Sequence, residues 1–98
     1  MSERSKAFLD SLEHATPPTG VSGLLLAVWH GLRGEWEVAH KIAQDDPTAE
    51  GAWVHGWLHR IEGDLSNAEY WYRRAGKPRA GDSVRLEGER IARSLLAG

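Results

Sequence analysis

The sequence predicts an all-α fold of about six helices, and three observations support this. Apolar residues recur at spacings of three and four along most of the chain, which is the period of an amphipathic helix. Glycines and prolines fall between these segments, where they end one helix before the next begins. No stretch shows the sustained apolar and polar alternation of a half-buried β-strand. We therefore expect a single helical-repeat domain over residues 1–98.

The first two helices are separated by the segment TPPTG, residues 16–20. We expect the first helix over residues 2–15, with Ser2 as its N-cap. The two prolines of TPPTG cannot continue it, because a proline lacks the backbone N–H that a helix interior uses. The second helix is expected over residues 21–32, with Ser22 as a candidate cap.

Glycine and proline also set the limits of the next two helices. Gly34 interrupts the pattern, and the third helix is expected over residues 35–44. The turn at residues 45–47, Asp-Asp-Pro, separates it from a fourth helix over residues 48–62. Gly63 follows directly and ends this fourth helix.

The last two helices are bounded in the same way. The fifth is expected over residues 64–75, with Gly76 as a left-handed C-terminal cap. A loop follows, and either Asp82 or Ser83 caps a sixth helix that runs to Leu96. The helices over residues 21–75 thus lie between one N-terminal and one C-terminal helix.

An internal repeat joins the four central helices. Residues 24–40 align with residues 53–69 without a gap, and the offset is 29 residues. Each unit contains one helix, a glycine turn followed by an acidic residue, and a second helix. Ala39 aligns with Ala68, and two antiparallel helices approach closely where one presents such a small side chain. The sequence therefore predicts two consecutive helix-turn-helix units.

This pattern resembles the tetratricopeptide repeat family. The second unit carries small, turn and aromatic residues at that family's spacing: Gly56, Gly63, Asp64, Leu65, Ala68, Tyr72 and Ala75. The first unit matches at Gly34, Trp36 and Ala39. The resemblance implies stacked helical hairpins whose inner side binds peptides in longer repeat proteins. More narrowly, the succession of WHGLRGEWEVAHKIAQD, HRIEGDLSNAEYWYRRAG and a final helix is similar to small bacterial proteins, a likeness that implies no activity.

Histidines in the repeat units form a candidate polar or metal-binding cluster. His55 and His59 are four residues apart, a spacing that lets two imidazoles on one helix share an ion. His30 aligns with His59 across the repeat, which makes His30, His55 and His59 the predicted cluster. His40 and Glu62 are alternative third ligands. The competing interpretation is that these imidazoles fill space between helices and form hydrogen bonds while neutral.

Aromatic residues supply the candidate contacts with a partner. Trp53 and Trp57 share the side of the fourth helix opposite to the histidines. If the repeat resemblance holds, this side faces the inner surface of the array, unless another helix covers it. Trp71 and Arg74 lie on the fifth helix, where a guanidinium stacked on an exposed indole binds anions. We therefore expect Trp53, Trp57, Trp71 and Arg74 to contact a ligand or partner.

Composition excludes several classes of function. The chain has no cysteine, so it has no disulfides, thiol catalysis or cysteine-ligated metal. The N-terminus has no continuous apolar stretch of the kind found in signal peptides or membrane spans, which predicts a cytoplasmic protein. From residue 73 onwards there are seven basic and three acidic residues, which we interpret as a solvated terminal helix and not as a nucleic-acid-binding surface. No phosphate-binding loop or nucleophile elbow is present, and no cofactor is expected.

These observations favour a binding protein over an enzyme. We expect an interaction module that binds a protein or peptide, or forms a homo-oligomer, through its aromatic helix faces. The alternative is a metal- or small-ligand-binding protein, or an enzyme, that uses His30, His55 and His59.

Overall fold

The computed structural model describes residues 3–97, and this part of the chain is entirely helical apart from its connections. The elements are α1 (Glu3–Asp10), the 3-10 helix η1 (Ser11–Glu13), α2 (Gly23–Leu32), α3 (Trp36–Gln44), α4 (Ala49–Glu62), α5 (Leu65–Ala75) and α6 (Val84–Ala97). The prediction of an all-α fold with six helices is confirmed over residues 3–97. The predicted N-cap Ser2 lies outside the described residues.

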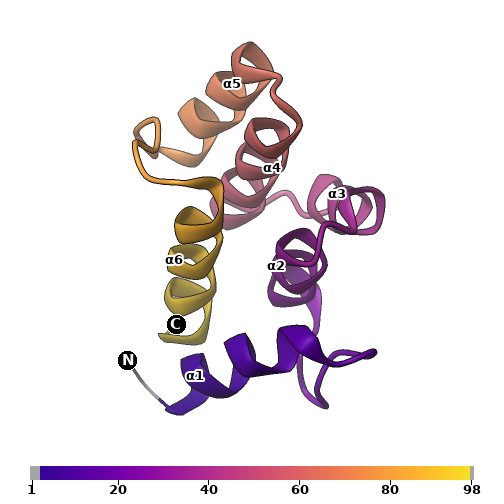
Figure 1. Ribbon diagram of the computed structural model, residues 1–98. Coiled ribbons are helices and arrows are strands. Elements are labelled where there is room, and N and C mark those ends of the chain that lie inside the picture. The colour runs from indigo at the N-terminus through magenta and orange to yellow at the C-terminus, as the bar shows by residue number, and fades with distance from the viewer. Residues whose placement is uncertain (1–2, 98) are drawn as a thin grey trace.

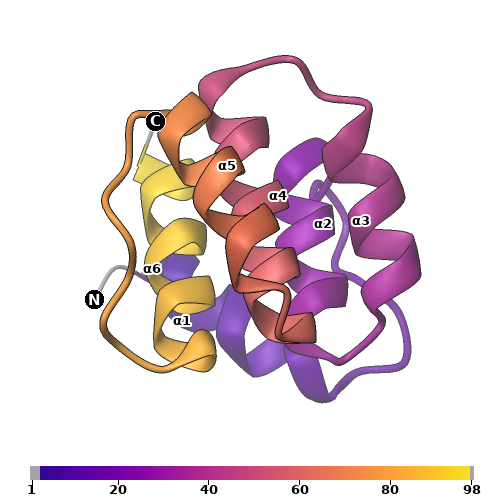
Figure 2. The ribbon, with the colours of Figure 1, turned by 90° about the horizontal axis from the view of Figure 1, so that it is seen from above.

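Helix α4 occupies the centre of the structure. The pairs α2–α3 and α4–α5 form two helical hairpins, and α3 also packs on α4 (Figure 1). Helix α6 returns along α2 and α4, while α1 packs against α6 at the base of the molecule. Figure 2 shows α5 in front of α4, with α6 on one side and α3 on the other. All residues from Gly51 to His59 are therefore buried.

The first helix ends earlier than predicted. The α-helix ends at Asp10 and is followed by the 3-10 helix η1, whereas the prediction extended the first helix to residue 15. The Ser11 hydroxyl donates to the carbonyl of Phe8 at 2.6 Å and accepts from the indole N–H of Trp29 at 3.0 Å. A serine that bonds back to its own helix competes with the helical pattern. The bond to α2 holds the serine in this position.

Three glycines end helices in the left-handed conformation. Gly34, Gly63 and Gly76 have φ angles of 81°, 88° and 71°. A residue with a Cβ is strained at such angles, so glycine is the residue these turns require. The predicted stop at Gly63 and the predicted cap at Gly76 are confirmed.

The helix N-termini differ in how they are capped. Thr48 accepts from the N–H of Gly51 at 3.0 Å, and Asp64 accepts from Asn67. Ser83 accepts from the N–H of Leu86 at 3.1 Å, so Ser83 and not Asp82 is the cap of α6. Ser22 occupies the N-cap position of α2 but forms no capping bond through its side chain. Its role as a side-chain cap was therefore predicted incorrectly.

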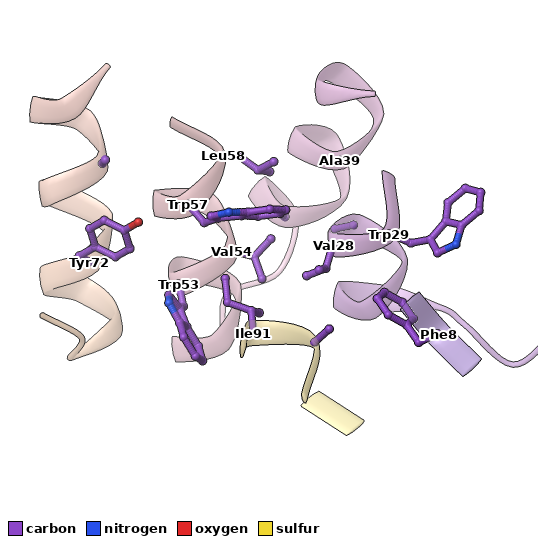
Figure 3. Packing of buried hydrophobic residues seen from close by; sticks show 14 residues of the cluster. Phe8, Val28, Trp29, Ala39, Trp53, Val54, Trp57, Leu58, Tyr72 and Ile91 are labelled. Atoms are coloured by element: carbon purple, nitrogen blue, oxygen red, sulfur yellow. The ribbon is translucent and has the colours of Figure 1, made fainter. Parts of the chain in front are cut away.

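The core is built around the indole of Trp57. In Figure 3 this side chain extends with Val54 from α4 towards Val28 of α2. Its ring N–H donates to the carbonyl of Val84 in α6 at 2.7 Å. Glycines of α2 and α6 lie against the ring, and a Cβ on Gly31 would lie only 2.6 Å from it. Three helices can thus approach one large side chain because two of them present glycine.

A buried carboxylate connects α4, α5 and α6. Glu87 of α6 is 1% exposed. It accepts hydrogen bonds from the Trp53 indole at 3.2 Å, the Arg60 guanidinium at 2.8 Å and the Tyr72 hydroxyl at 2.8 Å. Burial and the neighbouring Glu87 carboxylate raise the pKa of Tyr72, so this hydroxyl remains a donor. A buried charge is tolerated when it is paired and hydrogen-bonded, as here.

Replacing Glu87 should destabilise the fold more than replacing a surface glutamate of the same helix. Glu87→Gln leaves Arg60 without its buried partner, and we expect a loss on the order of 3 kcal/mol in urea unfolding. Glu89→Gln removes only an exposed pair with Arg85, for which we expect less than about 1 kcal/mol. Equal losses in the two variants would contradict the central role of the buried carboxylate.

Gly31→Ala should lower stability although alanine favours helices. The added methyl group overlaps the Trp57 ring, and overpacking of this kind costs about 1–3 kcal/mol. Gly81→Ala is the matched control, because no atom lies within 4 Å of a Cβ built there and its φ is not positive. Thermal unfolding should show a lowered midpoint for the first variant and an unchanged or raised one for the control.

Candidate functional site

Three histidines converge between α3 and α4. His40 comes from α3, and His55 and His59 come from successive turns of α4. Each offers a ring nitrogen, and these nitrogens lie within 4.8 Å of one another. The Nε2 atoms of His40 and His55 are 3.0 Å apart. His55 and His59 are each 7% exposed, while His40 is half-buried and gives the cluster contact with solvent.

In the structure His40, and not His30, lies beside His55 and His59. His30 lies at the end of α2, where its Nδ1 bonds with Glu35 at 2.8 Å and its ring meets the edge of Trp29. The sequence alignment of His30 with His59 correctly matched two positions at the ends of corresponding helices. Equivalent positions in consecutive units lie in different hairpins, however. His40 was an alternative third ligand, and packing of α3 on α4 brings it to the site.

Two tryptophans hold the histidine rings in place. Trp36 stacks on His40 with ring centroids 4.5 Å apart, and Trp71 stacks on His55 at 3.9 Å. The Trp36 indole donates to the carbonyl of Leu58 at 2.7 Å, which fixes its own orientation. Each of the two imidazoles is thus confined by the face of an indole. The lone pairs and N–H bonds of its nitrogens lie in the plane of the imidazole ring and do not point into the indole.

A carboxylate orients the third histidine. The Nδ1 of His59 lies 2.9 Å from Glu62 Oε1. When His59 is neutral, its proton on Nδ1 donates to this carboxylate and Nε2 carries the lone pair. Metal-binding histidines are held by the same arrangement, in which a carboxylate fixes the tautomer and makes the ring more basic. Glu62, predicted as an alternative ligand, is here the hydrogen-bond partner of His59.

Burial keeps the centre of the cluster uncharged. The pKa of His55 is lowered to about 4, first by burial and then by the charges of His40 and His59. Burial and the charge of His59 also lower the pKa of His40. Near neutral pH these two imidazoles are therefore uncharged, which is the state in which histidine binds metal ions.

A pocket of about 460 Å³ adjoins the cluster. It is lined by Gln44, Asp46, Pro47, Thr48, Ala49, Ala52, His55, Trp71 and Arg74. His55 belongs both to the pocket and to the histidine cluster. The predicted contact residues Trp71 and Arg74 lie in its wall, with the guanidinium 5.4 Å from the centre of the Trp71 ring. The structure therefore brings one half of the predicted contact set next to the histidines.

The other half of the predicted contact set is covered. Trp53 is 5% exposed and Trp57 is fully buried, because α6 lies over this face of α4. Lys77 lies over the Trp53 ring at 4.3 Å, and the Trp53 indole donates to Glu87. These two tryptophans therefore pack against α6, and of the two only Trp53 reaches a surface pocket, which it lines together with Glu50, Lys77 and Ser94.

Comparison with known proteins gives no relative: no family model, no curated protein and no solved structure matches the chain. The structure itself defines a small, compact domain of six helices over residues 3–97. Among the described helices, none is long and apolar enough to cross a membrane.

Acid should destabilise the metal-free protein through His55. Its pKa lies near 4 in the folded state and at about 6.5 in the unfolded chain, so the unfolded chain binds the proton first. The contribution of neutral His55 is complete above pH 6.5 and declines as the pH falls from 6.5 towards 4. Urea unfolding at several pH values, with a chelator present, should show this decline. His55→Gln should have a shallower decline, and an identical slope in both proteins would contradict the assignment.

Proposed function

We propose that this protein is a helical domain that binds one divalent transition-metal ion through His40, His55 and His59. The observation that carries the proposal is the convergence of three ring nitrogens from two helices within 4.8 Å. The 3.0 Å between the Nε2 atoms of His40 and His55 is close to the distance of about 3.3 Å between two nitrogens bound tetrahedrally to zinc with bonds of 2.0–2.1 Å. For an ion to bind, the rings must turn so that their lone pairs converge on one point.

The surroundings of the cluster suit a metal ion. Imidazole is a favoured ligand of zinc, copper, nickel and iron. Glu62 orients His59, and the stacked tryptophans restrict the other two rings, so little conformational entropy is lost when an ion binds. Three histidines fill three positions of a tetrahedral ion and leave the fourth for a non-protein ligand.

The tetratricopeptide-like arrangement is part of this proposal. Its support is the repetition of structure at the 29-residue offset, where Gly34 and Gly63 both end a helix with a positive φ. Ala39 and Ala68 are both buried where the second helix of each hairpin packs. The repeat thus supplies a scaffold in which a helix of the first hairpin and a helix of the second contribute ligands to one site.

A second function, contact with a peptide or a second copy of the chain, is favoured by one observation. Tyr70 is 48% exposed on α5, and the Arg74 guanidinium lies 5.7 Å from the centre of its ring. This surface is the remaining aromatic face, since α6 covers Trp53 and Trp57. Sedimentation velocity should show concentration-dependent association that Tyr70→Ser weakens. Monomer alone, with no peptide bound, would contradict it.

Metal binding is tested directly with protein made without an affinity tag. Calorimetric titration with Zn²⁺ should give one site per chain, and His40→Ala should weaken it by more than about tenfold because a ligand is lost. His30→Ala is the matched control, since His30 pairs with Glu35 away from the cluster. Circular dichroism establishes that both variants fold. The absence of a saturable site, or equal weakening by the two variants, would contradict the proposal.

A further inference from the structure

We infer that the pocket of about 460 Å³ between the α3–α4 turn and α5 binds a small zwitterion with an apolar body, such as an amino acid or a dipeptide. The carboxylate of this ligand pairs with Arg74, and its ammonium group pairs with Asp46. The inference goes beyond the proposed function, because it uses no metal ion and because neither residue belongs to the histidine cluster.

The pocket wall contains two opposite charges that come from different elements. Arg74 belongs to α5, whereas Asp46 belongs to the turn between α3 and α4. The ion pairs formed within residues 3–97 do not include one between these two side chains. Two charges that border one cavity without pairing can each bind one end of a ligand that carries both a cation and an anion.

Arg74 has N–H donors free for a carboxylate. Its guanidinium lies 5.4 Å from the centre of the Trp71 ring and 5.7 Å from that of Tyr70, so two aromatic rings restrict its position. Among the described residues it has no carboxylate partner, and its bond to the Tyr70 hydroxyl is long, at 3.4 Å. A guanidinium presents a planar fork of donors, and this fork matches the two oxygens of a carboxylate.

Asp46 has one carboxylate oxygen free for a cation. Its Oδ1 accepts from the backbone N–H of Thr48 at 2.9 Å and also from the Thr48 hydroxyl. These bonds fix the side chain at the start of α4, while Oδ2 accepts no hydrogen bond from a described residue. An ammonium group offers three donors, and Oδ2 together with the amide oxygen of Gln44 in the same wall can accept two of them.

The rest of the wall offers apolar surface. Pro47, Ala49, Ala52 and the ring of Trp71 contribute to it. The volume of about 460 Å³ falls in the range of small-molecule sites. A branched aliphatic side chain is small enough for this cavity, and its burial there removes apolar surface from water. The wall therefore favours leucine over glycine.

Calorimetric titration of metal-free protein, prepared with a chelating resin, tests the ligand class. The probes are leucine and the dipeptide glycyl-leucine, which differ in the separation of their charges, and at least one should bind saturably at one site per chain. Isocaproate and isoamylamine carry the same apolar body with only one of the two charges. Each should bind about fivefold or more weakly than leucine or the dipeptide, whichever binds tighter, because one charge-assisted pair is lost.

Glycine should also bind about fivefold or more weakly, because it buries no side chain. The inference is overturned if neither leucine nor glycyl-leucine binds saturably. It is also overturned if isocaproate, isoamylamine or glycine binds as tightly as the better of these two zwitterions.

Matched variants locate the two charges. Arg74→Ala and Asp46→Asn should each weaken binding of the zwitterion by about fivefold or more, because each variant removes one charge. Asp46→Asn keeps an oxygen that can accept from Thr48, so the start of α4 is preserved. The controls are Arg73→Ala and Asp45→Asn, exposed neighbours outside the pocket wall, which should change the affinity less than about twofold. Circular dichroism establishes that all four variants fold, and equal effects of a variant and its control would overturn the inference.

Discussion

The buried carboxylate of Glu87 decides which face of α4 becomes core and which becomes a site. Its charge requires donors from α4 and α5 together, so hydrogen bonds link α6 to both helices. In this position α6 packs along α4 (Figure 1), and Trp53 and Trp57 are buried. The opposite side carries His55 and His59. The candidate site is therefore on the imidazole side because a carboxylate holds a helix over the indole side.

Small residues then set the distance between the helices that form the site. A Cβ on Gly56 would lie 3.2 Å from the carbonyl of Ala68, so α5 approaches α4 as closely as it does because both residues are small. This approach places Trp71 flat on His55. Packing of α3 on α4 brings His40 to the same ring from another direction. The geometry of the three imidazoles thus follows from backbone contacts at some distance from the nitrogens.

Local signals predicted the helices and their ends, whereas contacts between distant segments were predicted only in part. Gly63 and Gly76 could be recognised because a left-handed turn depends on the glycine itself. Glu87 could not be distinguished from a solvated glutamate, since its burial depends on donors at least 15 residues away. The two faces of α4 followed from its periodicity, but which face α6 covers did not. The sequence repeat likewise predicted that His30 lies near the end of its own helix. It did not predict how far His30 lies from the histidines of the second hairpin.

The histidine rings meet through their nitrogens. His40 and His55 direct their Nε2 atoms at each other, as hydrogen-bonded imidazoles in a packed interface do and as two ligands of one ion would. In the metal-free protein the hydrogen bond between these atoms needs one proton, because two neutral imidazoles must act as donor and acceptor. Under the proposed function, the donor ring would carry its proton on Nδ1, so that both Nε2 lone pairs could face the ion, and His59 would supply a third nitrogen within 4.8 Å. The hydrogen bond and the proposed ion would thus use the same arrangement of α3 and α4.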